Sequence, residues 1–392
     1  MAQRDSFFGA AAAACLLAAA SQTVIAAPNI SQVTSTLDQK TLSATAGALN
    51  HKSTITISGA GFGTKATAAP LAWDDASGTA VTSTWDGAWP NKISQYNIAY
   101  RAPQRGISLP HTHITRYIAG AHGEKQGADG GANVMVFKSF TLPAAFPYYV
   151  YASWYQRADN AWVFGGDNNF KTFDYSVGNE PYANSNWYTG YGPPHPGSTT
   201  DSPQWGPNDD GKSLMNPDMN GHSFWWNHGV NPMSGKWSKV EVELKLTDQN
   251  DGFIRVTENG SNVVINYVGP TDKYAGKART IGIGGYARMT GQPNNWRYYA
   301  DIYLDTTLAH VVLANNADLS KATIVETQVP VRWADGSIDT VVNLGQFAEG
   351  QTAYLFVFDP TGAHNDKGFA VKAGTGVTSA PEPNAPTNVI VH

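Results

Sequence analysis

Cysteine is almost absent from this sequence. Cys15 is the single cysteine among 392 residues, and it lies in the apolar stretch FFGAAAAACLLAAA at residues 7–20. That stretch is too short to cross a membrane, and with the small residues that follow it is typical of a cleaved export signal. We therefore expect a signal peptide over residues 1–27 and a mature protein without disulfides. Such a protein fits a bacterial setting in which it is secreted, periplasmic or held at the cell surface.

Charged side chains are scarce as well. They make up 15% of the chain, and the net charge is −5 at pH 7. Proteins that bind nucleic acid present a basic face, so this composition excludes nucleic acid as a partner. Any attraction for an acidic polymer has to be local. Beyond the first 27 residues, no apolar run is long enough for a membrane span.

Several signatures of catalysis and cofactor binding are missing. The sequence contains no G-x-S-x-G nucleophile motif, no phosphate-binding loop and no dinucleotide-binding glycine pattern that opens a helix. His111 and His113 could share one face of a strand, an arrangement that suits zinc or copper. No cysteine and no fitting carboxylate stands close to them. We expect neither a metal nor another cofactor.

Short apolar runs bounded by Gly, Pro, Asn and Asp fill most of the chain. There are 39 glycines and 22 prolines, and helical periodicity is rare, which predicts an all-β fold. Residues 239–246 alternate charged and apolar side chains, as a half-buried strand does. Residues 254–268 consist of a strand, an Asn-Gly turn and a second strand, the pattern of a β-hairpin.

Three further strands carry tyrosine and arginine opposite their apolar side. They span residues 148–157, 281–289 and 297–304. Sheets that merely face water carry Lys, Glu and Thr, so these faces indicate the floor of a groove. The alternative is an aromatic-rich sheet that another part of the chain covers. The candidate residues on these faces are Tyr155, Arg157, Tyr286, Arg288 and Tyr299.

Residues 184–236 interrupt the strand pattern. They hold tryptophan, tyrosine and histidine among many Gly, Pro and Asn, and a long stretch of this kind inside a compact domain is usually functional. Exposed tryptophans stack on sugar rings, although about half of them should pack beneath the loop, because tryptophan is largely buried on average. We expect a loop that walls one end of the groove, with the candidate residues Trp187, Trp205, Trp225, Trp226, His222 and His228.

Three segments together resemble the core of the concanavalin A-like lectin/glucanase jelly roll. They are KWSKVEVELKLTDQNDGFIRVTENGSNVVINY (236–267), IGIGGYARM (281–289) and WRYYADIYLD (296–305). Legume-type lectins, several glycosidases and several polysaccharide lyases share this fold. The resemblance covers well under half of the chain, and a fold of this kind does not fix an activity.

The two ends of the chain resemble an immunoglobulin-like TIG (IPT) domain. STITISGAGFG (53–63) is similar to its opening, and residues 329–371 are similar to its later strands. We infer one small Ig-like sandwich with the jelly roll inserted into it; two separate, degenerate modules are the alternative. The expected segments are a signal peptide (1–27), the first Ig-like part (28–70), the jelly roll (71–317), the second Ig-like part (318–375) and a Pro-rich tail (376–392).

The carboxylate pattern of jelly-roll glycosidases does not occur. Those enzymes carry an acid and a nucleophile spaced as E-x-D-x-E on one strand face. Glu241 and Glu243 come closest, but Lys245 stands in the third place. With Lys239 on the same face, an ion-paired surface explains this strand better, so a retaining glycosidase is disfavoured.

A polysaccharide lyase needs a different set of groups. β-Elimination at a uronic acid requires a cation or amide on the carboxylate, a base for the C5 proton and an acid for the leaving oxygen. The resemblance implies Arg, Asn or Gln for the first task, and His and Tyr for the others. An arginine also supplies the cation that a tyrosine, with a pKa near ~10, needs to act as a base.

These observations predict a secreted lyase of an acidic polysaccharide. The alternatives are a non-catalytic lectin-like or adhesion module and a purely structural surface protein, in which the Tyr and Arg faces are covered. The expected catalytic residues are Tyr155, Arg157, Tyr286, Arg288, His222 and His228, and the expected substrate-binding residues are Trp187, Trp205, Trp225, Trp226 and Tyr299.

Overall fold

The computed structural model is all-β, as predicted. It describes residues 26–75, 83–88, 98–101, 117–120, 133–158, 169–177, 185–192, 202–206, 224–225, 237–272, 275–288 and 297–376. Apart from one short 3-10 turn, η3 (Leu319–Lys321), the regular structure in these residues is strand. None of them forms a helix long and apolar enough to cross a membrane. The predicted export signal and residues 377–392 lie outside the described residues.

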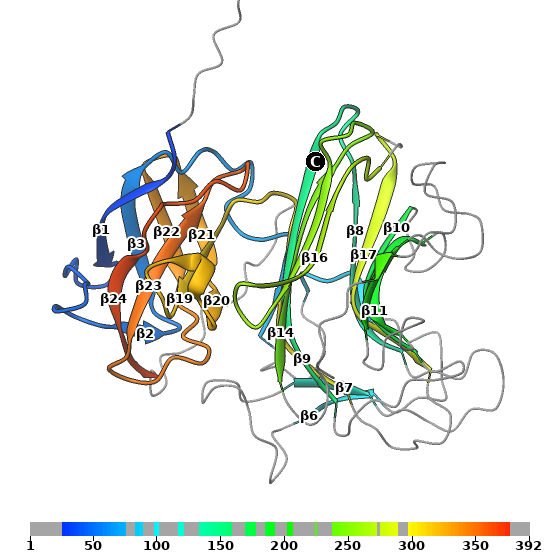
Figure 1. Ribbon diagram of the computed structural model, residues 1–392. Coiled ribbons are helices and arrows are strands. Elements are labelled where there is room, and N and C mark those ends of the chain that lie inside the picture. Colours follow the sequence, from blue (N-terminus) through cyan, green and yellow to red (C-terminus); the bar gives the residue numbers. More distant parts are fainter. Residues whose placement is uncertain are drawn as a thin grey trace, which may run out of the picture.

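The larger part of the chain is a sandwich of two antiparallel sheets (Figure 1). The seven-stranded sheet has the order β13 (Phe224–Trp225), β12 (Ser202–Gly206), β11 (Ser185–Gly192), β10 (Asn169–Val177), β17 (Ala278–Arg288), β8 (Asn133–Thr141) and β5 (Gly87–Ala88). The eight-stranded sheet has the order β16 (Asn262–Val268), β15 (Phe253–Glu258), β14 (Ser238–Leu246), β9 (Tyr148–Ala158), β18 (Arg297–Asp305), β7 (Tyr117–Gly120) and β6 (Ile98–Arg101), and β4 (Ala72–Asp74) also pairs with β18.

The predicted hairpin is confirmed as β15 and β16. These strands pair antiparallel, and the turn residues Asn259 and Gly260 have φ angles of 51° and 93°. Two consecutive positive φ angles are what a two-residue Asn-Gly turn requires. The alternation predicted over residues 239–246 is also present, because Val240, Val242 and Leu244 are buried in the core.

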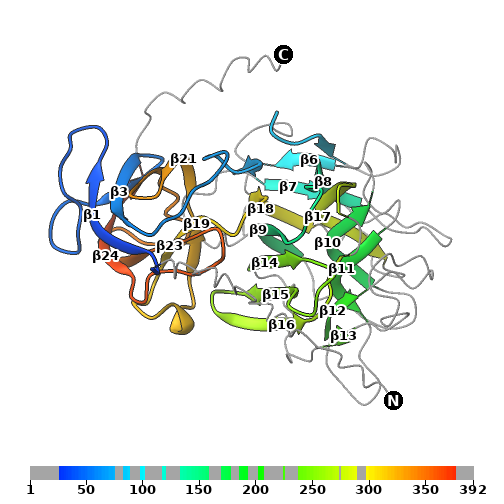
Figure 2. The same cartoon turned by 90° about the horizontal axis from the view of Figure 1, so that it is seen from above.

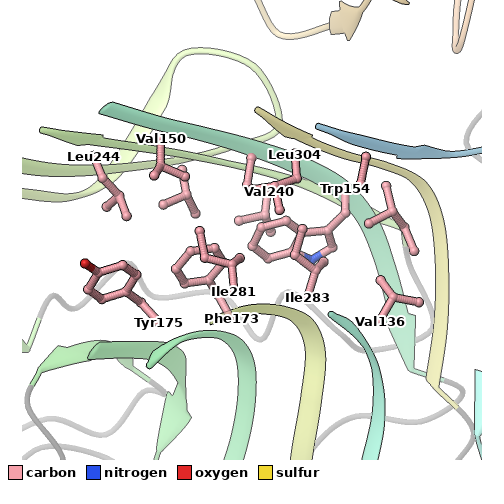
Figure 3. Close-up of a cluster of buried hydrophobic side chains, with 14 of the residues drawn as sticks. Val136, Val150, Trp154, Phe173, Tyr175, Val240, Leu244, Ile281, Ile283 and Leu304 are labelled. Atoms are coloured by element: carbon pink, nitrogen blue, oxygen red, sulfur yellow. The ribbon is translucent and has the colours of Figure 1, made fainter. Parts of the chain in front are cut away.

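One hydrophobic core fills the space between the two large sheets (Figure 3). Val150, Trp154 and Val240 enter it from the eight-stranded sheet, and Phe173 and Ile283 from the seven-stranded sheet. The rings of Trp154 and Phe173 stack with centroids 6.0 Å apart. The apolar side chains lie at alternate positions along each strand, since successive residues of a strand face opposite sides of the sheet.

A smaller sandwich combines strands from both ends of the chain (Figure 2). Its buried core holds Val33 and Ile57 from the N-terminal part and Val311, Leu355 and Val371 from the C-terminal part. The four-stranded sheet has the order β1 (Asn29–Ser35), β3 (Thr54–Ala60), β22 (Ser337–Val341) and β21 (Val329–Ala334). The five-stranded sheet has the order β2 (Leu49–His51), β24 (Phe369–Gly376), β23 (Thr352–Phe358), β19 (His310–Ala314) and β20 (Val325–Thr327).

The boundary predicted at residue 317 needs correction. Strand β19 (His310–Ala314) pairs with β20 and β23 in the small sandwich, so the chain leaves the larger sandwich after β18. Sequence pattern alone did not separate these strands, because every side chain of β19 is buried and a continuous apolar run fits either core. The immunoglobulin-like character of the small sandwich stays a prediction.

The small sandwich covers the outer face of the eight-stranded sheet (Figure 1). Tyr151 of β9 stacks on the ring of His310, with centroids 3.8 Å apart. The hydroxyls of Ser153 and Thr327 are 2.9 Å apart, and Tyr155 donates a 2.7 Å hydrogen bond to Glu326. The prediction of a groove on this face is therefore wrong. The alternative, an aromatic-rich sheet that another part of the chain covers, describes this face.

Lys239 is a buried cation of this interface. Its side chain is 3% exposed and lies 4.0 Å from the carboxylate of Glu326, which is fully buried. Its Nζ donates hydrogen bonds of 2.5 Å to the carbonyl oxygen of Val325 and 3.1 Å to the hydroxyl of Thr327. Water is excluded from both charges, so each depends on protein groups for its solvation.

We predict that Lys239→Met lowers the free energy of unfolding by about 3–5 kcal/mol, because it leaves a buried carboxylate without its cation. Urea denaturation followed by tryptophan fluorescence measures this. Lys245→Met is the matched control, since the Asp251 partner of Lys245 is 70% exposed and such pairs contribute about 0–1 kcal/mol. Equal losses of unfolding free energy in the two variants would show that the burial of Lys239 and Glu326 contributes nothing.

Candidate functional site

The second outer face of the larger sandwich belongs to the seven-stranded sheet. It lies on the side away from the small sandwich, and no described strand packs across it (Figure 1). This face differs from the one that the small sandwich covers, and it carries the remaining tyrosine–arginine pair of the sequence.

The strand register pairs Tyr286 and Arg288 of β17 with two asparagines on the neighbouring strands. Tyr286 is paired with Asn133 of β8, and Arg288 is paired with Asn169 of β10. Directly opposite residues of antiparallel strands share a face, as do residues two apart on one strand. Tyr286 therefore shares a face with Asn133, and Arg288 shares one with Asn169. Counted by twos from the core residue Ile283, Tyr286 and Arg288 fall on the side away from the core, whereas Asn169, counted from the core residue Phe173, falls on the core side, because the register shifts between Phe170 and Phe173. Sequence reasoning missed Asn133 and Asn169, because both lie at strand ends far from β17 in sequence.

The chain is irregular next to this group. Gly284 has a φ of +88°, a conformation that residues with a side chain rarely adopt. The register between β10 and β17 shifts between Phe170 and Phe173, in the same part of the sheet. Irregularities of this kind bend a strand and re-aim its side chains, and they occur often beside active sites.

Farther along the same face lies a row of buried polar side chains. Ser176 donates a 2.5 Å hydrogen bond to Asp174, and the hydroxyls of Ser139 and Thr280 are 2.9 Å apart. Asp174, Ser176 and Thr280 are fully buried. Polar groups on a sheet face are buried only where partners satisfy them, so this end of the face is built from polar contacts.

The strand register puts the tryptophans predicted to bind substrate on two different sides of the seven-stranded sheet. Trp187 is paired with Tyr175, and Trp205 lies in one row with Thr189 and Phe173. Tyr175 and Phe173 are core residues, so Trp187 and Trp205 occupy positions in line with the core side. Trp225 is paired with Gln204, the neighbour of Trp205, and therefore falls on the opposite side, that of Tyr286.

Tyr155 does not lie in an open groove. Its side chain is 1% exposed; its hydroxyl donates to Glu326 and accepts a 2.8 Å hydrogen bond from the amide of Gln346. Burial, together with the negative charge of Glu326, raises the pKa of Tyr155 well above its usual value. This phenol remains protonated and acts as a structural donor, so the predicted proton-transfer role is not supported.

The structure also separates the two predicted tyrosine–arginine pairs. Arg157 lies on β9, where it is paired with Tyr298 of β18 in the eight-stranded sheet. Tyr286 and Arg288 lie on β17 in the seven-stranded sheet. The hydrophobic core stands between these sheets, so the two pairs do not form one site.

Tyr299 belongs to the core and not to a binding face. It is 1% exposed and clusters with Ile302 and Leu304. A register shift between Ala300 and Tyr303 breaks the alternation of faces along β18. Tyr303 lies on the other side of the sheet, in a cluster with Tyr151. The predicted substrate contact by Tyr299 is therefore wrong.

The histidines of the long loop, His222 and His228, lie outside the described residues, as do Trp226 and the pair His111 and His113. Their roles stay predictions.

The similarities of this chain to known proteins are similarities of structure. No protein-family model matches the sequence, and no curated protein matches it. Among solved structures, the chain is similar to an endo-β-1,4-glucuronan lyase from the fungus Trichoderma reesei, with 12% identity over 61% of this chain and 97% of that chain and a TM-score of 0.43. It is also similar to an alginate lyase from Pseudomonas aeruginosa, with 9% identity over 53% of this chain and 87% of that chain and a TM-score of 0.33.

A further likeness is to the carbohydrate recognition domain of Emp47p, with 12% identity over 61% of this chain and 94% of that chain and a TM-score of 0.36. At these identities and TM-scores the likenesses carry no inference about chemistry.

Proposed function

We propose that this protein is an exported polysaccharide lyase that cleaves an acidic polysaccharide by β-elimination. The observation that carries the proposal is the register of β17, which pairs Tyr286 with Asn133 of β8 and Arg288 with Asn169 of β10 in the seven-stranded sheet. A tyrosine can serve as the base of this reaction, and an arginine and amides can neutralise the carboxylate of the substrate. The face also lies opposite the one that the small sandwich covers (Figure 1).

In the proposed reaction, Arg288 and Asn169 neutralise the carboxylate of a uronic acid and thereby acidify its C5 proton. The guanidinium also favours the phenolate form of Tyr286, since a nearby positive charge lowers the pKa of a phenol. Tyr286 takes the C5 proton, the electron pair forms the C4–C5 double bond, and the glycosidic oxygen at C4 leaves. His222 or His228 returns a proton to that oxygen.

Local charge is necessary in this proposal, because the chain as a whole carries a net charge of −5. A negative protein does not attract a polyanion over long distances, and salt screens exposed charges beyond about 10 Å. Arg288 therefore has to act at short range, in concert with the amides beside it.

We predict that the protein releases unsaturated uronate products from at least one uronic-acid polysaccharide, and that Tyr286→Phe lowers the initial rate by about 10²–10⁴-fold, the usual contribution of a general base. The ultraviolet absorbance of the conjugated double bond, followed over a panel of such polysaccharides, measures this. Unchanged turnover by Tyr286→Phe would contradict the assignment of the base.

Tyr155→Phe is the matched control, because it removes the same hydroxyl from the buried interface. We expect its elimination rate to equal that of the unmodified protein. Its free energy of unfolding should fall by about 1–3 kcal/mol, because the variant removes one buried hydrogen bond that Glu326 accepts and one that the side-chain amide of Gln346 donates. Loss of elimination in a folded Tyr155→Phe variant would restore the predicted catalytic role of Tyr155.

The second candidate function is glycan binding without cleavage. The register position of Trp225, on the same side as Tyr286, favours it, because a tryptophan beside a polar sheet face can stack on a sugar ring. A flat absorbance trace over the whole panel, together with glycan binding that Trp225→Ala weakens, would favour this function over the lyase.

A further inference from the structure

A cavity of about 210 Å³ lies between the two sandwiches, away from the face proposed for catalysis. One wall comes from the outer face of the eight-stranded sheet and the other from the small sandwich. The side chains that matter for its chemistry are Glu241, Glu243, Arg255, His310, Phe358 and His364.

His310 supplies an uncharged acceptor to this cavity. Its ring is held between Tyr151 and Phe358, with centroid distances of 3.8 and 4.1 Å. Its Nδ1 donates a 2.7 Å hydrogen bond to the carbonyl oxygen of Leu308, so Nε2 carries the lone pair. Burial lowers the pKa of His310 to about 3, which keeps the ring neutral. The side chain is 2% exposed, and among the described residues nothing donates to Nε2.

Two carboxylates face the same space. The hydroxyl of Tyr151 donates a 2.6 Å hydrogen bond to Oε1 of Glu241, which fixes that carboxylate. Among the described residues, the charged partner of Glu243 is Arg255, whose Nη1 lies 3.7 Å from Oε2, beyond hydrogen-bonding distance. Burial raises the pKa of Glu243. The negative charge of Glu241 raises this pKa further, and the positive charge of Arg255 lowers it. Two carboxylates against one guanidinium leave the cavity negative and rich in acceptors.

A metal ion does not fit this cavity. Within the part of the chain that the structure describes, no three His, Cys, Asp or Glu side chains converge as a metal site requires. The acceptors are spread over two walls, so a ligand has to reach them with several donors. The volume lies below the ~300–1,000 Å³ typical of sites for drug-sized ligands, which indicates a compact molecule.

We propose that the cavity between the sandwiches binds a compact amino sugar. Its ammonium group lies between Glu241 and Glu243, and one of its hydroxyls donates to Nε2 of His310. An apolar edge of the sugar contacts Phe358. Charge-assisted hydrogen bonds to the two carboxylates supply the selectivity for a protonated amine over a neutral hydroxyl.

Glucosamine and glucose make a matched pair of probes, because they differ in one amine that replaces a hydroxyl. We predict that glucosamine binds at about pH 6, where amines are protonated, at least about tenfold more tightly than glucose, as charge-assisted bonds are stronger than neutral ones. Titration followed by NMR measures both affinities, and the ¹⁵N resonance of Nε2 of His310 should shift on addition of glucosamine. Equal affinity for the two sugars, or no binding of either, would overturn the proposal.

Variants test the same site independently of elimination activity. Glu243→Gln keeps the size of the side chain and should weaken glucosamine binding at least about tenfold, because it removes one charged acceptor. Glu349→Gln removes the same charge from an exposed position of the small sandwich and should leave the affinity unchanged. A folded Glu243→Gln variant that binds glucosamine as before would refute the assignment. Elimination activity is expected to persist in both variants, so a failure of this proposal is distinct from a failure of the lyase proposal.

Discussion

The two sandwiches are joined through a buried polar contact centred on Lys239. Its ammonium group projects from the eight-stranded sheet and donates to the backbone of Val325 and the hydroxyl of Thr327, near the carboxylate of Glu326. These partners all come from β20 of the small sandwich. A buried charge is stable only where protein groups replace its water. Lys239 can therefore be buried on the outer face of the eight-stranded sheet only because the small sandwich docks there and supplies its hydrogen-bond partners.

This contact decides what each face of the larger sandwich can do. The tyrosines of β9 become interface residues, with Tyr155 bonded to Glu326 and Tyr151 stacked on His310. The seven-stranded sheet is left to carry Tyr286 and Arg288. The same docking creates the cavity that Glu243 lines, because its walls come from both sandwiches. The face proposed for elimination and the cavity proposed to bind an amino sugar thus lie on opposite sides of the larger sandwich.

Local pattern predicted much of the fold and little of the site. The hairpin at Asn259 followed from an Asn-Gly pair between apolar runs, and the buried positions of β14 followed from alternation. The assignment of Tyr155 and Tyr286 to different sheets depends on long-range pairing, which strand pattern does not contain. Tyr299 was misplaced because a register shift breaks the alternation. The burial of Tyr155 depends on a second domain, whose docking no local rule predicts.

Hydroxyl-radical footprinting of the intact protein tests the central claim, that the small sandwich closes the outer face of the eight-stranded sheet. Tyr151, Tyr155 and Tyr303 are at most 1% exposed, whereas Leu37 is 94% exposed. We expect the three tyrosines to remain unmodified at a dose that oxidises Leu37 extensively. Oxidation of Tyr151 and Tyr155 at the rate of freely exposed tyrosines would contradict it, because that result would mean that the face is open.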